Sequence, residues 1–266
     1  MKRTIGLIFF CAFVLSSCKF QQLMKSTDNA MKYEKAKEYY AKGDYLRAYT
    51  LLEDISPAYK GTPEGEDVLH MIADSYFKNK NYQTAINYYN AYNNNFPTGK
   101  YTADCHFMIG YCYYKQSADA RLDQTETYSA LNALRLYLEK YPFDSRTSEA
   151  AQLVEELENK LAYKELLNAR LYYKLGNYIG NNYLSAIIVA QNAVKNYPFN
   201  LYREEFAFIV LKSKFMQAEK SILDKKEDRY RDTIDEYYVY SAEFPDGKNK
   251  KEAEHIFNIS KKHINE

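Results

Sequence analysis

Residues 69–97 read LHMIADSYFKNKNYQTAINYYNAYNNNFP, and the rest of the chain can be interpreted from this stretch. It holds two amphipathic helical segments, separated by a turn at Asn79 and Asn81. Small residues stand where two antiparallel helices would cross and large residues flank them, which is the tetratricopeptide pattern. The matching positions are Leu69, Ala73, Tyr76, Ala85, Tyr89 and Pro97. Such a helical hairpin exposes an apolar face, so it requires similar neighbours that stack on it.

Copies of this pattern precede and follow the stretch. The first copy starts at Asp28 or Asn29, either of which can cap a helix, and its second helix covers residues 46–55. The third copy has Gly110 in the small position. Its two helices are separated by inserted residues around 118–126, and a long loop of this kind is a candidate contact site.

The fourth copy has an unusually long first helix. From Pro142 to Ala169 is 27 residues, against 13 from Pro97 to Gly110. The 14 extra residues have a helical composition without a breaker, and at ~1.5 Å per residue they add about 21 Å of helix. We therefore expect one continuous helix between the first three repeats and the last two.

The fifth copy is the most divergent. The sequence predicts a helix over residues 204–221, a charged loop over 224–228 and a second helix over 230–244. An amphipathic helix over 250–264 would cover the apolar end of the stack, as repeat proteins require for solubility.

The expected fold is all-α: a tetratricopeptide-repeat α-solenoid of about five helical hairpins with a C-terminal capping helix. We expect a lipoprotein signal peptide in residues 1–17 and a lipidated linker in 18–28. Repeats one to three would occupy residues 29–142. The long connecting helix, repeats four and five and the capping helix would occupy 143–266.

The signal-peptide prediction depends on the first 18 residues. Lys2 and Arg3 precede an apolar run over 5–15, which is too short for a membrane-spanning helix and typical of a signal-peptide core. Small residues then precede Cys18, a pattern that resembles the bacterial lipobox. We expect Cys18 to carry acyl chains such as palmitate and to tether the protein to a membrane. The alternative is an ordinary secretory signal with an incidental cysteine.

The residue after Cys18 indicates in which bacterial membrane the lipid anchor would lie. Lys19 stands where an aspartate would resemble an inner-membrane retention signal, so the outer membrane is favoured. No acidic run of the kind found in some surface-exported lipoproteins follows. We therefore predict the periplasmic face of the outer membrane.

Two cysteines, Cys105 and Cys112, remain in the mature chain. Seven residues along one helix separate Cα atoms by about 10 Å, and a disulfide requires less than about 7 Å. The sequence therefore favours buried free thiols. His106 lies between them, but neighbouring helical residues point in different directions, so a metal site is the weaker alternative. No metal and no cofactor are expected.

Composition excludes several classes of function. The chain has 266 residues, 29 Tyr, no Trp and only 9 Gly, which favours a helical protein without glycine-rich phosphate loops. Its net charge is +1, or −1 without Lys2 and Arg3, so nucleic-acid binding has no support. No zinc-protease, serine-hydrolase or nucleotide-binding motif occurs. We predict that the protein is not an enzyme.

The candidate binding residues lie on the first helix of each of the first three hairpins. In stacked hairpins these helices line the concave side. Side chains at offsets of −3, +1, +4 and +5 from the small residue point away from the partner helix of the same hairpin. These positions form an aromatic strip with basic edges, suited to an extended peptide with aromatic side chains and an acidic end. The predicted groove residues are Tyr33, Lys37, Tyr40, His70, Asp74, Phe77, Lys78, Phe107, Tyr111, Tyr114 and Lys115. The alternative is that their aromatic rings pack between adjacent repeats.

The lipobox, the five hairpins divided three plus two and the long helix resemble the BamD family of outer-membrane assembly lipoproteins. The more specific element is Leu-Ala-Tyr-Lys-Glu at 161–165, followed by Ala169, Tyr172, Tyr173 and Gly176 and closed by Tyr197-Pro198. The resemblance implies a non-enzymatic subunit of the β-barrel assembly machine. Its second half would dock on the POTRA domains of BamA, and its first half would receive unfolded outer-membrane proteins.

Two other classes share the repeats. A periplasmic repeat lipoprotein that acts as an adaptor for cell-wall enzymes would have the same anchor and hairpins. A starch-binding lipoprotein also contains such repeats but needs a large additional sugar-binding region, for which this chain is too short.

Overall fold

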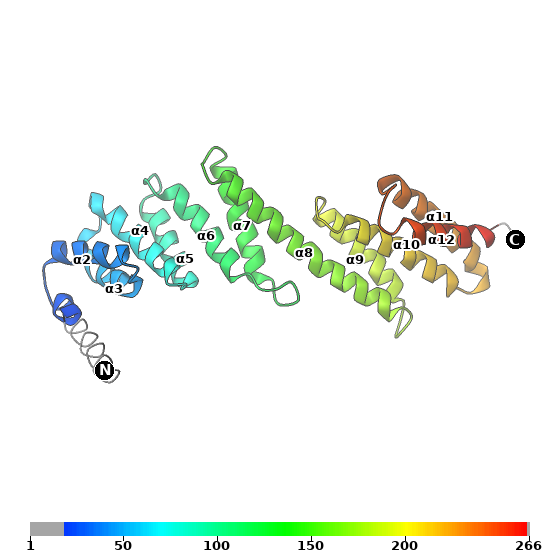
Figure 1. The fold of residues 1–266 in the computed structure, drawn as a ribbon, viewed down its shortest axis with the longest axis horizontal. Helices are drawn as coiled ribbons and strands as arrows, with labels where there is room; N and C mark the ends of the chain where they lie inside the picture. Colours follow the sequence, from blue (N-terminus) through cyan, green and yellow to red (C-terminus); the bar gives the residue numbers. More distant parts are fainter. Residues whose placement is uncertain (1–18, 265–266) are drawn as a thin grey trace, which may run out of the picture. The chain divides into compact units, whose positions relative to one another are not determined.

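The computed structural model describes residues 19–264, which are mostly helical and contain no β-strand (Figure 1). The predicted fold class, an all-α tetratricopeptide-repeat solenoid, is confirmed by the succession of helices and their pairwise packing. The predicted signal peptide over 1–17 and the lipidated Cys18 lie outside the described residues. The chain divides into two compact units: unit 1 comprises Met1–Ser117 and Thr125–Ala151, and unit 2 comprises Ala118–Gln124 and Gln152–Glu266.

Unit 1 consists of three helical hairpins and the start of a fourth. Each helix packs on the next along the chain, so the hairpins stack in sequence order. Its elements are α2 (Asn29–Ala41), α3 (Tyr45–Ile55), the 3-10 helix η1 (Ser56–Tyr59), α4 (Pro63–Lys78), α5 (Tyr82–Asn95), α6 (Thr102–Gln116) and α7 (Thr125–Lys140).

Side-chain caps explain where these helices begin. The Asp28 carboxylate accepts a hydrogen bond of 2.9 Å from the amide of Met31, as the sequence predicts for the start of α2. Asn81 does the same for α5, and Lys80 before it adopts a φ of 62°, the left-handed conformation that ends α4. The predicted turn between the two template helices is therefore confirmed.

The small positions of the repeats are buried where helices cross. Ala36, Ala73 and Ala85 are fully buried. A Cβ atom on Gly110 would lie 2.8 Å from side-chain atoms of Leu134 on α7. A glycine at this position thus allows α6 and α7 to approach more closely than any larger residue would.

The long helix of the fourth repeat is also present. It is α8, which runs without interruption over Thr147–Leu175 for 29 residues. The predicted long loop of the third repeat lies between α6 and α7, where Gln124 closes it by donating a hydrogen bond of 2.7 Å to the carbonyl of Asp119.

Unit 2 contains most of α8 and four further helices. Ala162, Leu166 and Ala169 of α8 belong to a core cluster that includes Ala186 and Phe206. In a second core cluster, Ala253 and Ile256 of the capping helix pack with Phe208, Leu211 and Tyr240. The further helices are α9 (Asn182–Asn196), α10 (Arg203–Glu219), α11 (Leu223–Glu243) and α12 (Lys250–Lys262).

One prediction about unit 2 is wrong. Residues 224–228, expected to form a charged loop, are the first turns of α11. Asp224 lies in the first turn, where a carboxylate interacts favourably with the helix dipole. Glu227 forms an ion pair of 2.6 Å with Arg231 one turn later. The charged residues 224–228 therefore stabilise the start of α11, whereas the sequence-based prediction placed them in a loop before this helix.

Candidate functional site

The predicted groove residues lie on three successive first helices of unit 1: α2, α4 and α6. Most are half-buried because they contact one another across these helices. The predicted groove residues therefore form a network of contacts and not a row of solvated side chains.

Phe107 does not fit the prediction of an exposed strip. It is fully buried, and the guanidinium carbon of Arg146 lies 3.5 Å from the centre of its ring. Tyr137 of α7 packs edge-on against it at 5.4 Å. Phe107 thus belongs to the core between repeats, because α7 and the segment before α8 cover the face that was expected to meet solvent.

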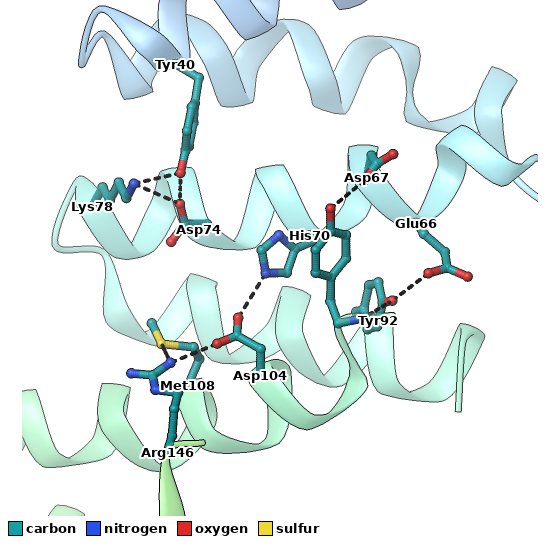
Figure 2. Close-up of polar contacts among 11 residues, drawn as sticks. Tyr40, Glu66, Asp67, His70, Asp74, Lys78, Tyr92, Asp104, Met108 and Arg146 are labelled. Carbon is teal, nitrogen blue, oxygen red and sulfur yellow. Dashed lines mark hydrogen bonds and ion pairs between the residues drawn. The ribbon is translucent and has the colours of Figure 1, made fainter. Parts of the chain in front are cut away.

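Tyr40 joins α2 to α4. Its hydroxyl donates a hydrogen bond to the carboxylate of Asp74 and accepts one of 2.7 Å from Nζ of Lys78 (Figure 2). Burial and the bond to Asp74 raise the pKa of Tyr40 to about 12, so the hydroxyl stays protonated and acts as a donor at neutral pH. Lys78 completes the contact by pairing with Asp74 at 3.3 Å.

His70 and Asp104 join α4 to α6. Nε2 of His70 lies 3.1 Å from Oδ2 of Asp104, and Nη1 of Arg146 donates to Oδ1 of the same carboxylate at 2.8 Å (Figure 2). Burial opposes ionisation of Asp104, but His70 and Arg146 outweigh it and hold the pKa of the carboxyl below its usual range. The carboxylate of Asp104 on α6 thereby joins α4 to the segment before α8.

A third link lies nearer the start of these helices. The hydroxyl of Tyr101 donates to Asp67 at 2.7 Å, and Lys100 forms an ion pair with the same carboxylate at 2.7 Å. Glu66 accepts a hydrogen bond of 2.9 Å from Tyr92 of α5 (Figure 2). Polar side chains near the start, the middle and the end of α4 are thus engaged in contacts with neighbouring helices.

The three links between first helices have a common spacing. Tyr40 and Asp74, Asp67 and Tyr101, and His70 and Asp104 are each 34 residues apart. Equivalent positions in successive repeats, such as Ala36 and Ala73, are 37 apart. Each link therefore joins a residue on one first helix to a residue about one turn before the equivalent position in the next repeat. A search of the sequence for polar or aromatic pairs at a spacing of 34 residues would have found the three links.

A pocket of about 350 Å³ opens beside these links. Four of its lining residues were predicted from the sequence, namely Tyr33, Lys37, Tyr40 and His70. Three were missed: Asp67, Met71 and Tyr101. Asp67 and Tyr101 were missed because they lie more than three residues before the small residues Ala73 and Gly110, outside the offsets used for the prediction. The 34-residue spacing nevertheless relates them to each other.

Four further predicted residues, Phe77, Tyr111, Tyr114 and Lys115, form an aromatic cluster outside the pocket. The rings of Phe77 and Tyr111 are 5.8 Å apart, and those of Tyr111 and Tyr114 are stacked at 5.8 Å. Nζ of Lys115 lies 4.8 Å from the centre of the Tyr111 ring. The predicted strip therefore consists of the pocket and a separate aromatic cluster, with Phe107 buried beneath.

The pocket combines aromatic surface with charged groups of both signs. Tyr33, Tyr40 and Tyr101 supply aromatic surface, and Lys37, Asp67 and His70 supply both signs of charge. Within residues 19–264, no group of three or more His, Cys, Asp or Glu side chains is arranged to hold a metal ion.

The cysteines behave as predicted for buried thiols. Cys105 and Cys112 are free and fully buried. Burial raises the pKa of both thiols, that of Cys112 to about 12, so both are protonated and unreactive at neutral pH.

Comparison with known proteins identifies the family. The model of the YfiO family, described as "Outer membrane lipoprotein", matches residues 25–227. The chain belongs to this family. The match includes the pocket, the aromatic cluster and the helices α8 to α10.

Individual relatives carry the name BamD. A protein of that name from Aquifex aeolicus is 26% identical over 211 residues, which cover 77% of this chain and 65% of the relative. The outer membrane protein assembly factor BamD of Caulobacter vibrioides is 27% identical over 106 residues, which cover 40% of this chain and 35% of the relative. The matched regions thus span less than two thirds of either relative's length.

The matches among solved structures are at low sequence identity. The solved structure described as "TPR2AB-domain:pHSP90-complex of yeast Sti1" aligns over 88% of this chain and 98% of its own length, at 14% identity and a TM-score of 0.41. No helix within residues 19–264 of the present chain has the length and apolar character needed to span a membrane.

Proposed function

We propose that this protein is a non-enzymatic subunit of the machinery that assembles β-barrel proteins in the outer membrane. Membership of the YfiO family and the similarity to proteins named as BamD assembly factors support this role. In this proposal unit 1 binds unfolded outer-membrane proteins and unit 2 docks on the POTRA domains of BamA. Lipid on Cys18 holds both at the periplasmic face of the outer membrane.

The pocket on unit 1 carries the substrate part of the proposal. Unfolded barrel proteins present extended segments in which apolar and polar residues alternate, with aromatic residues near the ends of the strands. Tyr33 and Tyr101 offer ring surface for such a side chain, and Lys37 lies at the same pocket for a carboxylate. An extended peptide with an aromatic residue and an acidic end fits this combination.

The polar links beside the pocket support binding without large rearrangement. Tyr40, His70 and Asp67 each have a partner on the neighbouring first helix or its N-terminal turn. A pocket whose walls are held in this way loses little conformational entropy when a peptide enters.

The division into two compact units supports separate roles for them. Unit 2 has its own core clusters and its own capping helix, so its surface does not depend on residues that line the pocket of unit 1. Substitutions in the pocket should therefore leave a partner of unit 2 bound.

Affinity capture tests the proposal as a whole. The full chain, solubilised from membranes in mild detergent, is expected to recover BamA, and the Tyr33→Ala variant is expected to recover the same amount. Recovery of cell-wall enzymes without BamA would contradict the proposal and favour the adaptor role.

A further inference from the structure

One end of unit 2 displays large apolar side chains on two neighbouring connections. Tyr178 and Ile179 lie between α8 and α9, with 70% and 85% of their surface exposed. Ile222 lies just before α11 and Leu223 at its start, with 66% and 86% exposed. We name these four residues the apolar tip.

The two connections lie at the same end of the unit. Successive helices of unit 2 run antiparallel, so every second connection falls on the same side, and Figure 1 draws both on the lower side of the unit. Nε2 of Gln217, near the end of α10, donates a hydrogen bond of 3.1 Å to Oδ1 of Asn181, the cap of α9. This bond ties one connection to the other.

The first connection has a defined conformation. The amide of Asn182 donates to the carbonyl of Gly176 at 2.9 Å, and its side chain donates to the carbonyl of Tyr178 at 2.6 Å. Ile179 adopts a φ of 48°, which is rare for a β-branched residue. Such backbone strain persists where the surrounding structure enforces it, and here it accompanies the display of an isoleucine to solvent.

Basic side chains predominate around the apolar tip. The helical turns and connections that border the tip contain four lysines: Lys174, Lys220, Lys225 and Lys226. They contain two acidic residues, Glu219 and Asp224, and the Glu219 carboxylate already accepts a hydrogen bond from Tyr230. Glu227, one turn after Leu223, is paired with Arg231. Exposed apolar side chains that gather at one place and are rimmed by polar residues are typical of a contact site.

The chemistry of the tip matches a lipid surface better than a protein groove. Projecting aliphatic side chains can enter the acyl boundary of a bilayer, a tyrosine suits the headgroup layer, and lysines attract anionic headgroups. We propose that the apolar tip inserts into the interfacial layer of a membrane that contains anionic lipids. Unit 2 thereby has a membrane contact of its own, which does not depend on the substrate pocket or on Cys18.

Site-specific fluorescence on the full chain tests this contact. Single Ile179→Cys and Leu223→Cys variants carry an environment-sensitive fluorophore, and Phe199→Cys serves as the matched control. Phe199 is 84% exposed, but it lies between α9 and α10, at the opposite end of the helices. All variants carry Cys11→Ala and Cys18→Ala, so that neither thiol is labelled and no lipid anchor is attached. The chain without an added cysteine gives the labelling background from the buried Cys105 and Cys112, which is low. The probe surfaces are vesicles of phosphatidylethanolamine with phosphatidylglycerol, and vesicles of phosphatidylcholine alone.

The expected result is an emission shift to shorter wavelength at positions 179 and 223 with the anionic vesicles, and quenching by a lipid-borne nitroxide. The shift should be weaker with phosphatidylcholine, and position 199 should not respond. An equal response at 199, or no response at 179 and 223, would overturn the proposal. A shift that grows with protein concentration in the absence of lipid would assign the tip to a second copy of the chain. Shielding that appears only when BamA is added would assign it to that protein. Either result would also overturn the proposal.

Discussion

Nε2 of His70 lies 3.1 Å from Oδ2 of Asp104, and this contact joins the first helices of the second and third repeats. The other oxygen of the same carboxylate accepts a hydrogen bond from Arg146, whose guanidinium covers the ring of Phe107. A single aspartate thus couples the wall of the candidate pocket to the core of unit 1.

The first prediction concerns Asp104 and acid. Asp104→Asn should lower the free energy of unfolding by about 1–3 kcal/mol at neutral pH, because hydrogen bonds to charged partners are lost. The pKa of Asp104 is lowered in the folded protein, so its contribution is present above the unfolded value of about 3.9. The contribution is lost as the pH falls through the lower folded value. The difference between wild type and variant in urea unfolding should therefore shrink below about pH 4.

Glu139→Ala provides the control for this prediction. Glu139 is an exposed carboxylate on α7 of the same unit, and its removal should change the stability little at any pH. A constant difference between Asp104→Asn and wild type from pH 7 down to pH 3 would contradict the role assigned to Asp104.

The second prediction concerns the crossing of α6 and α7. Gly110→Ala should lower the free energy of unfolding by about 1–3 kcal/mol, because the new methyl group would overlap Leu134. Adding Leu134→Ala should cost less in the Gly110→Ala background than in wild type, since the two side chains would compete for the same space. Additive costs in thermal unfolding would show that the helices can separate freely at this point.

The third prediction concerns the thiols. Cys105 and Cys112 should react with a thiol reagent only when the chain unfolds, because burial raises the pKa of both. Cys112→Ser should cost about 1–3 kcal/mol if the hydroxyl finds no partner. Reducing agent should leave the melting temperature unchanged. A lower melting temperature under reduction, at constant protein concentration, would require a disulfide that the helix does not permit.

The fourth prediction concerns the anchor. Cys18→Ala should leave the repeats folded but release most of the protein from membranes, because the acyl chains supply most of the membrane affinity and the apolar tip alone supplies a weaker contact. Fractionation and circular dichroism of wild type and variant measure the two effects separately. An unmodified Cys18 in the mature protein, observed by mass spectrometry, would refute lipidation.

The fold was predictable because helix crossings demand small side chains at fixed intervals. Ala36, Ala73 and Gly110 mark these crossings in the sequence, and they are buried in the structure. The charged segment over 224–228 was misassigned because composition alone does not distinguish a polar loop from the polar first turns of a helix. The position of Asp224 and the pairing of Glu227 with Arg231 decide for the helix.

The candidate site was predictable only in part. Offsets within one helix give the direction of a side chain but not the neighbour that it meets. Phe107 illustrates this, because Arg146 lies in a later repeat and covers the ring. The pairing of Asp67 with Tyr101 was missed for the same reason, although its 34-residue spacing recurs in the sequence.

The affinity of the pocket for a peptide tests the account most directly. The ligand is a fluorescent extended peptide that ends in an aromatic residue with a free carboxylate, titrated with the full chain. Tyr33→Ala should weaken binding about tenfold, equivalent to about 1.4 kcal/mol, because it removes aromatic surface from the pocket. Tyr128→Ala, which removes an exposed tyrosine of α7 outside the pocket, should leave the affinity unchanged. Equal affinities for wild type and Tyr33→Ala, with both proteins melting at the same temperature, would contradict the assignment of substrate binding to this pocket.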